Sequence, residues 1–320
     1  MATPTHQDHP NSDTTTLSER ASLPPQTAHR IAVGVNGYPE GLDAAALGAA
    51  ISRATGAAMT LVAVHPDPMV VLPEGMNWRS LEQHARQVLA ETRDALAPEA
   101  RVAVRTDHSV ARALHRVMST EHRDLLVVGS SRHAPPGHVR IGKRTRQLLC
   151  RFESPLAIAP RGLHDRSDLT LQRIGVGYDG SPESEAALSW AAGLALASDG
   201  ELRIRAVVDD RMPTVGWGEV WIGDMMRDWV DVVGEEKGSC RQHAQAAAAK
   251  LGARFEAEAV AGRPADALLA LADDVDLMVV GSRRWGPAKR LLLGSTGEAL
   301  MHDAACPVVA VPRPTPPASR

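Results

Sequence analysis

The two halves of the chain contain the same series of short segments in the same order. A repeat on this scale indicates a duplicated domain, because solenoids repeat units of only about 20–50 residues. The offset between the copies grows along the chain, so the second copy carries a small insertion, which we place around residues 211–231. The matching pairs are RIAVGVNG (30–37) with RIGVGYDG (173–180), DLLVVGSSR (124–132) with DLMVVGSRR (276–284), and SPLAIAP (154–160) with CPVVAVP (306–312).

Each copy alternates short apolar segments with longer Ala/Leu-rich or amphipathic ones. Strands that lack polar alternation and are separated by helices indicate a parallel sheet covered on both faces. We therefore predict two tandem α/β domains, at residues 29–160 and 173–313, with a linker at 161–172. The flanking segments, 1–28 and 314–320, read as a disordered arm and a loose tail. In the first copy the predicted strands are 30–37, 59–65, 102–106, 124–129 and 155–159, and the predicted helices are 42–55, 79–96, 109–120 and 145–151.

The charge and cysteine content of the chain limit which kinds of partner and compartment we expect. A net charge of −3 and a pI of about 6.5 provide no global basic field for a nucleic acid or a membrane surface. Cys150, Cys240 and Cys306 are far apart and form no CxxC pair, which fits a reducing compartment. We therefore predict a cytoplasmic protein that binds neither nucleic acid nor membrane. Cys306 is either a buried structural thiol or a reactive sensor.

Residues 276–296 form the stretch with the clearest potential for binding. Its apolar start, 277–280, predicts a strand that stops at Gly281, followed by a loop and by a helix beyond Gly294. Glycine lets backbone approach a ligand, and the free N–H groups of a helix start favour an anion. Ser295 or Thr296 either caps this helix or offers a hydroxyl to a phosphate. The stretch is therefore either an ordinary capped helix or an anion cradle.

Both halves resemble universal stress protein domains, and the whole chain resembles a tandem universal stress protein of the actinobacterial type. The features that carry the resemblance are Asp179-Gly180-Ser181 after a strand, DLMVVGSRR, Gly294-Ser295-Thr296 and the closing ACPVVAVP. The resemblance covers about residues 30–312. It implies a Rossmann-like (adenine nucleotide alpha hydrolase-like) fold with a five-stranded parallel sheet in each domain. It also implies ATP, with or without Mg²⁺, at the carboxyl ends of the strands, where open α/β sheets place ligands.

The family's ATP signature is a glycine, two residues, a glycine, nine residues, and a glycine followed by Ser or Thr. Gly281 and Gly294-Ser295 match its ends, whereas Arg284 replaces the middle glycine and Gly286 follows two residues later. An arginine near phosphates adds a cation, while Gly286 keeps the loop flexible. The arginines of this segment either pair with phosphates or form a solvated basic loop. The resemblance therefore assigns to the site Gly281, Ser282, Arg283, Arg284, Gly286, Gly294, Ser295 and Thr296.

The resemblance places three further segments beside the nucleotide. Asp179, with Gly180 and Ser181, follows the first strand of the second half, where a carboxylate can bind ribose hydroxyls or a metal. Asp179 can equally fix the turn and cap the next helix. Val207 matches the position whose backbone meets adenine, although it can be simply a core residue. Gly262 opens the helix that follows the fourth strand.

The first half departs from this pattern. Asn36 replaces the aspartate, and Lys143 occupies the Ser/Thr position. Gly129 and Gly142 keep the thirteen-residue spacing, with Arg132 in place of the middle glycine. Basic residues at 140, 143, 144 and 146 either hold a phosphate by charge or serve another anion or a partner. We interpret this half as an altered or lost nucleotide site.

No catalytic residues are assigned. The chain has no GxSxG, HExxH or paired-cysteine motif and no evident general base, so any ATP hydrolysis is expected to be slow. The leading hypothesis is an ATP-binding stress-response protein whose occupancy alters its conformation or its choice of an unidentified protein partner. The alternatives are a slow ATPase or nucleotidyl transferase, and a nucleotide-free dimerisation scaffold. The apolar final strands, PLAIAP and PVVAVP, predict an internal pseudo-dimer, which is compatible with a homodimer of tandem chains.

Overall fold

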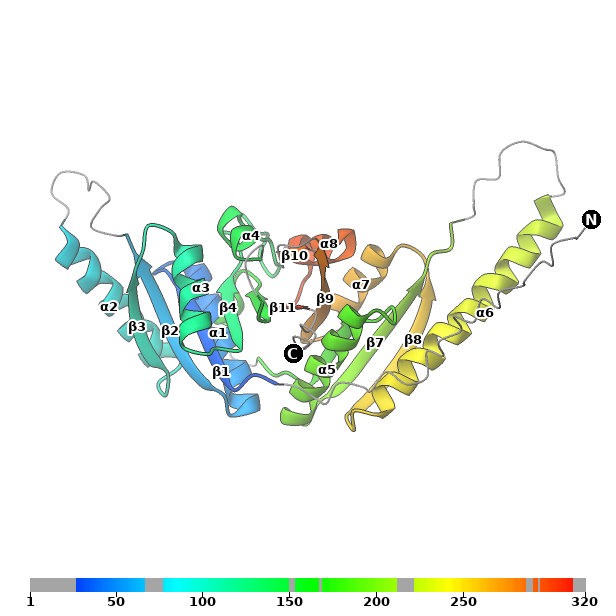
Figure 1. Ribbon diagram of the computed structural model, residues 1–320, viewed down its shortest axis with the longest axis horizontal. Coiled ribbons are helices and arrows are strands. Elements are labelled where there is room, and N and C mark those ends of the chain that lie inside the picture. Colours follow the sequence, from blue (N-terminus) through cyan, green and yellow to red (C-terminus); the bar gives the residue numbers. More distant parts are fainter. Residues whose placement is uncertain are drawn as a thin grey trace, which may run out of the picture.

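The computed structural model describes residues 27–66, 77–149, 153–166, 169–211, 222–285, 290–292 and 294–312 (Figure 1). The predicted tail and nearly all of the predicted arm lie outside these residues. Ala28, at the end of that arm, is only 1% exposed and packs in the core.

The first half forms a parallel sheet in the order β3-β2-β1-β4-β5. This is the five-stranded Rossmann-like sheet that the resemblance implies, and the predicted strands and helices are all present with small shifts at their ends. In chain order the elements are β1 (Arg30–Val35), α1 (Pro39–Thr55), β2 (Ala58–His65), α2 (Trp78–Leu96), β3 (Arg101–Thr106), α3 (Val110–Thr120), β4 (Leu125–Gly129), α4 (Lys143–Leu149) and β5 (Leu156–Ala159).

The second half repeats this order as β8-β7-β6-β9-β11. Helix α6 has 28 residues where α2 has 19, so the insertion between the copies lies at this helix. The elements are β6 (Arg173–Gly177), α5 (Pro182–Ala197), β7 (Glu201–Val208), α6 (Ile222–Ala249), β8 (Arg254–Ala261), α7 (Pro264–Ala272), β9 (Leu277–Trp285), β10 (Arg290–Leu292), α8 (Ser295–Asp303) and β11 (Val308–Pro312).

The final strands of the two halves join them into one sheet. β5 and β11 pair in antiparallel orientation, with Ile158 opposite Val308 and Leu156 opposite Ala310. This is the pairing that the sequence predicts for PLAIAP and PVVAVP. Figure 1 shows the two halves side by side about this junction, with β3 and β8 at the outer ends of the sheet.

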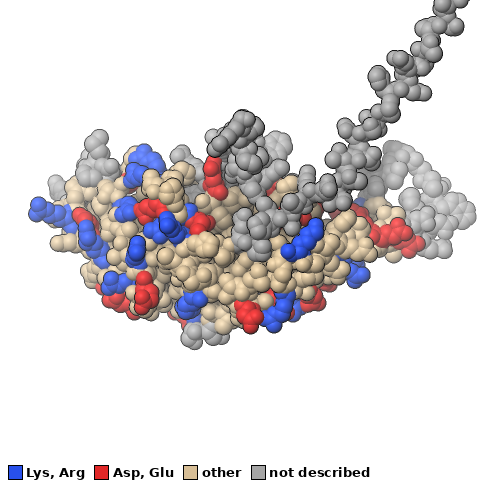
Figure 2. All heavy atoms as spheres, turned by 60° about the horizontal axis from the view of Figure 1, so that its bottom comes forward, with Lys and Arg blue, Asp and Glu red and all other residues tan. Residues whose placement is uncertain are grey.

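Helices cover both faces of the sheet. One layer packs Leu47 of α1 and Leu188 of α5 against it, together with residues of α2 and α6. The other packs Leu114 of α3 and Leu300 of α8, together with residues of α4 and α7. Burial on both faces explains why strands such as β4 are apolar at successive positions. On the face seen in Figure 2, basic and acidic side chains are interleaved, with a broad area between them that carries few charges.

The segment predicted as a polar linker is docked on α1. Leu163 and Leu171 are buried, and residues Leu163–Asp165 form a short 3-10 helix. The carboxylate of Asp43, in α1, is fully buried and accepts the backbone N–H groups of Gly162 and His164, each at 3.0 Å. The ring Nδ1 of His164 lies 2.5 Å from the same carboxylate. Asp43 therefore ties the connection between the halves to the first half.

Candidate functional site

A tight turn follows β6 and carries Asp179. Asp179 is exposed, and its Oδ1 accepts the backbone N–H of Ser181 at 3.0 Å. Gly180 has φ +72°, a left-handed conformation that glycine adopts without strain. Ser181 is the N-cap of α5, since its Oγ accepts the N–H of Ser184 at 3.2 Å. Asp179 thus fixes the turn, while the capping role belongs to Ser181.

Tyr178 directly precedes this turn and anchors it, and it was not singled out from the sequence. The side chain is buried, and its hydroxyl donates to Glu185 Oε1 of α5 at 2.5 Å. Burial, followed by this bond to a carboxylate, raises the pKa of Tyr178 far above its usual range. The position is occupied by Val35 in the first half. The sequence did contain a signal for this residue, because Tyr178 is one of only two tyrosines in the chain and directly precedes Asp179.

The glycines that end β4 and β9 make room for a helix. A Cβ on Gly281 would lie 2.4 Å from the carbonyl oxygen of Glu183 in the first turn of α5. A Cβ on Gly129 would lie 1.9 Å from the carbonyl oxygen of Glu40 in α1. Real Cβ atoms are essentially never this close to backbone. In both halves this glycine therefore allows a helix start to pack against the end of the neighbouring strand.

The loop predicted after Gly281 is instead a β-hairpin. β9 continues to Trp285, and β10 folds back along it, with Leu292 opposite Arg283 and Arg290 opposite Trp285. The prediction that the strand stops at Gly281 was therefore wrong. Backbone that runs past the parallel sheet still needs hydrogen-bond partners, and the hairpin provides them locally. Gly286 and the side chains of Arg283 and Arg284 lie outside the described residues.

Ser282 does not face the site. Its side chain is fully buried, and its Oγ donates to the carbonyl oxygen of Val311 in β11 at 3.2 Å. Ser130 in the first half does the same, donating to the carbonyl oxygen of Ala159 in β5 at 2.7 Å. The serine after the strand therefore holds the last two strands of each half together.

Helix α8 begins without a side-chain cap. Gly294 is the N-cap, so of the two roles left open for Ser295 and Thr296, capping this helix is excluded. Ser295 is exposed and Thr296 is half-buried. The N–H of Glu298 bonds to the carbonyl oxygen of Gly294 at 2.9 Å, which leaves the earlier N–H groups of the turn without partners within the helix. These groups and the helix dipole favour an anion.

Two other predicted positions lie at neighbouring strand ends. Gly262 follows β8 with φ +132°, and among the residues that the structure describes no atom outside its chain neighbours lies within 4 Å of where its Cβ would be. Its N–H donates to the carbonyl oxygen of Val208 at 2.9 Å. Val207 is half-buried and packs against the core on the face that α7 and α8 cover. The carboxyl ends of β6, β7 and β8 therefore bring Asp179, Val207 and Gly262 to one edge of the sheet.

The matching turn of the first half is stabilised without a charge. Asn36 Oδ1 accepts the N–H of Tyr38 at 3.2 Å, and its Nδ2 donates to Glu40 at 3.3 Å. Arg132 is exposed, and its Nε lies 3.3 Å from Nε2 of His133. Lys143 is the first residue of α4, and its side chain is not described. Asn36 thus reproduces the turn contact of Asp179 but offers a ligand no carboxylate.

The loop that contains Gly142 is a contact between the two halves. The N–H groups of Val139 and Ile141 donate to the carbonyl oxygens of Ala304 and Met301, at the end of α8, at 2.8 and 3.0 Å. Arg146 pairs with Glu298 of the same helix at 3.2 Å. Figure 1 shows α4, β10 and α8 together at the junction. The basic segment of the first half therefore holds the last helix of the second half.

Two kinds of feature are absent from the described residues. No group of three or more His, Cys, Asp or Glu side chains among them is placed to hold a metal ion. No helix that they form is long and apolar enough to cross a membrane.

Cys306 is expected to resist thiol reagents in the native protein. It is 3% exposed, and burial raises the pKa of its thiol to about 12, so almost no reactive thiolate exists at neutral pH. Cys240 is half-buried and should be labelled before Cys306. Peptide mass spectrometry after brief alkylation, with urea-unfolded protein as the control, checks this order. Native labelling of Cys306 as fast as that of Cys240 would support a sensor role.

Comparisons with known proteins give a consistent result. The model of the universal stress protein family matches residues 27–160 and 170–312. The chain is 26% identical over 305 residues to universal stress protein Rv2005c of Mycobacterium tuberculosis (strain ATCC 25618 / H37Rv), covering 89% of this chain and 97% of that protein. A universal stress protein structure from Archaeoglobus fulgidus DSM 4304 matches with 15% identity and a TM-score of 0.63, covering 89% of this chain and 99% of that chain. The protein PA1789 from Pseudomonas aeruginosa PAO1 matches with 13% identity and a TM-score of 0.61, covering 89% and 93%. At these identities the structural matches concern the fold alone.

Proposed function

The chain belongs to the universal stress protein family, and from this premise we propose that its second half binds ATP at the carboxyl ends of β6, β7 and β9. ATP occupancy would then alter the conformation of this cytoplasmic protein, or its choice of a protein partner, in a stress response. The observation that carries the proposal is the start of α8. Gly294 leaves the first N–H groups of the helix uncapped, and such groups bind phosphate oxygens.

The residues around this helix start fit a nucleotide. The hydroxyls of Ser295 and Thr296 stand in the first turn of α8, where they can donate to phosphate oxygens. Asp179, exposed at the end of β6, can accept hydrogen bonds from ribose hydroxyls while it keeps its contact to the turn. The open space at Gly262 and the strand end at Val207 leave room for a base. Bound ATP would supply the charge of its phosphates, and these groups of the protein would orient it.

The first half does not offer the same fit. Asn36 carries no charge, and the loop before Gly142 is engaged with α8 through Val139 and Ile141. We therefore assign one nucleotide site to the chain. Because that loop holds the end of the helix whose start would bind ATP, occupancy in the second half can be transmitted to the first.

Isothermal titration calorimetry of the full chain with ATP should show one dominant site. Gly294→Val and Asp179→Ala should each abolish or strongly weaken binding. Asn36→Ala, the matched change in the first half, should leave it within about twofold. Thermal melting of each variant without ligand separates lost binding from lost folding.

The competing functions give different results in the same samples. No heat and no shift in melting temperature with millimolar ATP would reject the proposal in favour of a nucleotide-free scaffold. Rapid release of phosphate that depends on Asp179 would identify an ATPase instead of a binding protein.

A further inference from the structure

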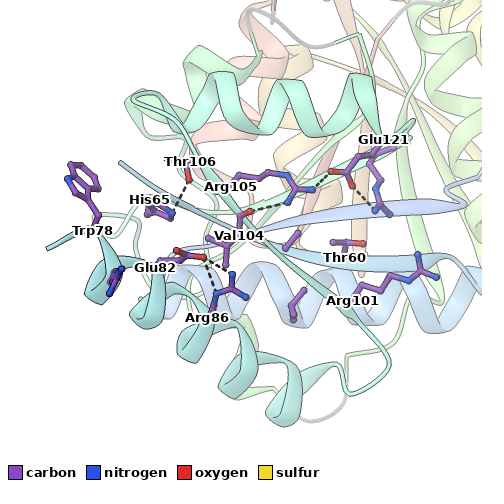
Figure 3. A pocket seen from close by; sticks show the side chains of 14 residues that line it. Thr60, His65, Trp78, Glu82, Arg86, Arg101, Val104, Arg105, Thr106 and Glu121 are labelled. Carbon is purple, nitrogen blue, oxygen red and sulfur yellow. Dashed lines mark hydrogen bonds and ion pairs between the residues drawn. The ribbon is translucent and has the colours of Figure 1, made fainter. Parts of the chain in front are cut away.

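A hollow runs along the free edge of β3, at the outer end of the sheet from the junction of the halves (Figure 3). Its volume is about 640 Å³, and its lining comes from both faces of the sheet. Five arginines but only two glutamates line it. The local charge is therefore clearly positive, in a chain whose net charge is −3.

Five residues gather on the face of the sheet that α3 covers, and we call them the Arg101 cluster: Thr60, Arg101, Arg105, Glu121 and Arg123. Thr60 and Arg101 are register partners on parallel strands, so their side chains leave the sheet on the same face. Arg105 lies four residues after Arg101 on β3 and therefore also points to this face. Figure 3 shows Thr60, Arg101, Arg105 and Glu121 lining this part of the hollow.

The charges of the Arg101 cluster do not cancel. Glu121 accepts hydrogen bonds from both Arg105 and Arg123, the latter at 3.0 Å. Arg101 has no ion pair with any residue that the structure describes. The cluster thus contains three guanidinium groups and one carboxylate, and that carboxylate holds Arg105 and Arg123 in place.

Two buried polar atoms of the cluster lack partners. Thr60 is 3% exposed, and its Oγ1 has no hydrogen bond to the described residues. The Nε of Arg123 is likewise buried and unpartnered, on a side chain that is 11% exposed. Leaving such groups unsatisfied destabilises the folded protein, because each has lost its hydrogen bonds to water. An anionic oxygen is an acceptor that can satisfy a hydroxyl and a guanidinium N–H together.

At the equivalent place in the second half, the arginines are paired with glutamates. In the register of the second sheet, Arg203 stands where Thr60 stands in the first, and Glu256 stands where Arg101 stands. Arg203 pairs with Glu201 at 2.6 Å and also with Glu256. Arg205 pairs with Glu258 at 2.9 Å. The hollow there is about 210 Å³, lined by three arginines and three acidic residues. The excess of positive charge is therefore specific to the first half and does not follow from the fold.

We propose that the Arg101 cluster binds a phosphate group, either inorganic phosphate or the phosphate of a small phosphorylated compound. Arg101 supplies the free charge, Arg105 and Arg123 supply oriented N–H donors, and Thr60 donates its hydroxyl. The site lies in the first half of the chain, on the face of β2 and β3 that α3 covers. It is therefore separate from the ATP site proposed in the second half, and neither proposal depends on the other.

Titration of the full chain with inorganic phosphate at constant ionic strength tests this site, and variants within the cluster separate it from the proposed nucleotide site. Arg101→Ala should weaken phosphate binding about tenfold, the equivalent of one lost charged hydrogen bond. Thr60→Val should also weaken binding but should raise the melting temperature without ligand, because it removes a buried unsatisfied hydroxyl. Glu121→Gln should tighten binding by removing the opposing charge. Glycerol 3-phosphate as a second ligand distinguishes the sources: tighter binding than inorganic phosphate indicates a phosphorylated compound.

Arg79→Ala is the matched control, because Arg79 lines the same hollow from α2, on the other face of the sheet. It should change phosphate affinity by less than about twofold. The proposal is overturned if Arg101→Ala and Thr60→Val leave the affinity unchanged, or if Arg79→Ala is as harmful as Arg101→Ala. It is also overturned if the wild-type chain binds neither ligand at about 10 mM.

Discussion

Gly129→Ala is expected to destabilise the protein by about 3 kcal/mol, the upper end of what overpacking usually costs. The new Cβ would lie 1.9 Å from the carbonyl oxygen of Glu40, which is backbone and cannot rotate away as a side chain can. Helix α1 would have to lift from the end of β4. The midpoint of urea unfolding should fall accordingly, measured by circular dichroism.

The control for this change is Gly234→Ala. Gly234 is an exposed residue of α6, with no atom within 4 Å of where its Cβ would be. Alanine there should stabilise the helix by about 0.5–1 kcal/mol. Gly281→Ala should resemble Gly129→Ala, since its Cβ would lie 2.4 Å from Glu183. A loss below about 1 kcal/mol in Gly129→Ala would mean that α1 moves easily, against the packing role argued for this glycine.

Asp43→Ala is expected to cost about 3 kcal/mol. The substitution leaves the partly buried N–H groups of Gly162 and His164 without their acceptor, and each such loss costs about 1–3 kcal/mol when the group stays away from water. Asp43→Asn should cost less, because its amide keeps one acceptor oxygen. Urea unfolding of both variants gives the comparison. Hydrogen exchange at residues 162–164 should also accelerate in Asp43→Ala, because the connection would come away from α1.

Asp165→Ala provides the contrast for Asp43. The side chain of Asp165 is 78% exposed, and its Oδ1 lies 3.5 Å from Nε2 of His164. Exposed ion pairs contribute little, so the change should stay within about 0.5 kcal/mol. If both aspartates gave the same small effect, the docking of the connection on α1 would contribute little to stability.

The fold was accessible from the sequence because its signals are local and occur twice. Unbroken apolar segments such as residues 125–128 predict buried parallel strands wherever they stand, and the second copy confirmed the reading of the first. The pairing of the final strands followed from a related argument, since an apolar edge needs a cover. Gly294 correctly indicated where α8 starts, whereas the sequence did not identify Gly294 itself as the N-cap.

The missed features depend on contacts between distant residues. Residues 283–285 were read as loop because the strand was expected to stop at Gly281, yet the pairing with β10 decides their conformation. The connection was read only as a polar linker, whereas Asp43, more than a hundred residues earlier in the chain, binds it. Gly129 and Gly281 were assigned to ligand approach from the family's signature. Only the paths of α1 and α5 show what their missing side chains make room for.

The pairing of β5 with β11 has a consequence for how the protein behaves at low abundance. In a single-domain chain, such pairing could form only between two molecules, and it would be lost on dilution. Here both strands belong to one chain, so their effective concentration is set by the connection between the halves and not by the number of molecules. Contacts across that junction, including the hold of Val139 and Ile141 on α8, therefore persist in an isolated molecule. We expect the two halves to remain joined at nanomolar concentration, where a dimer of separate domains would fall apart.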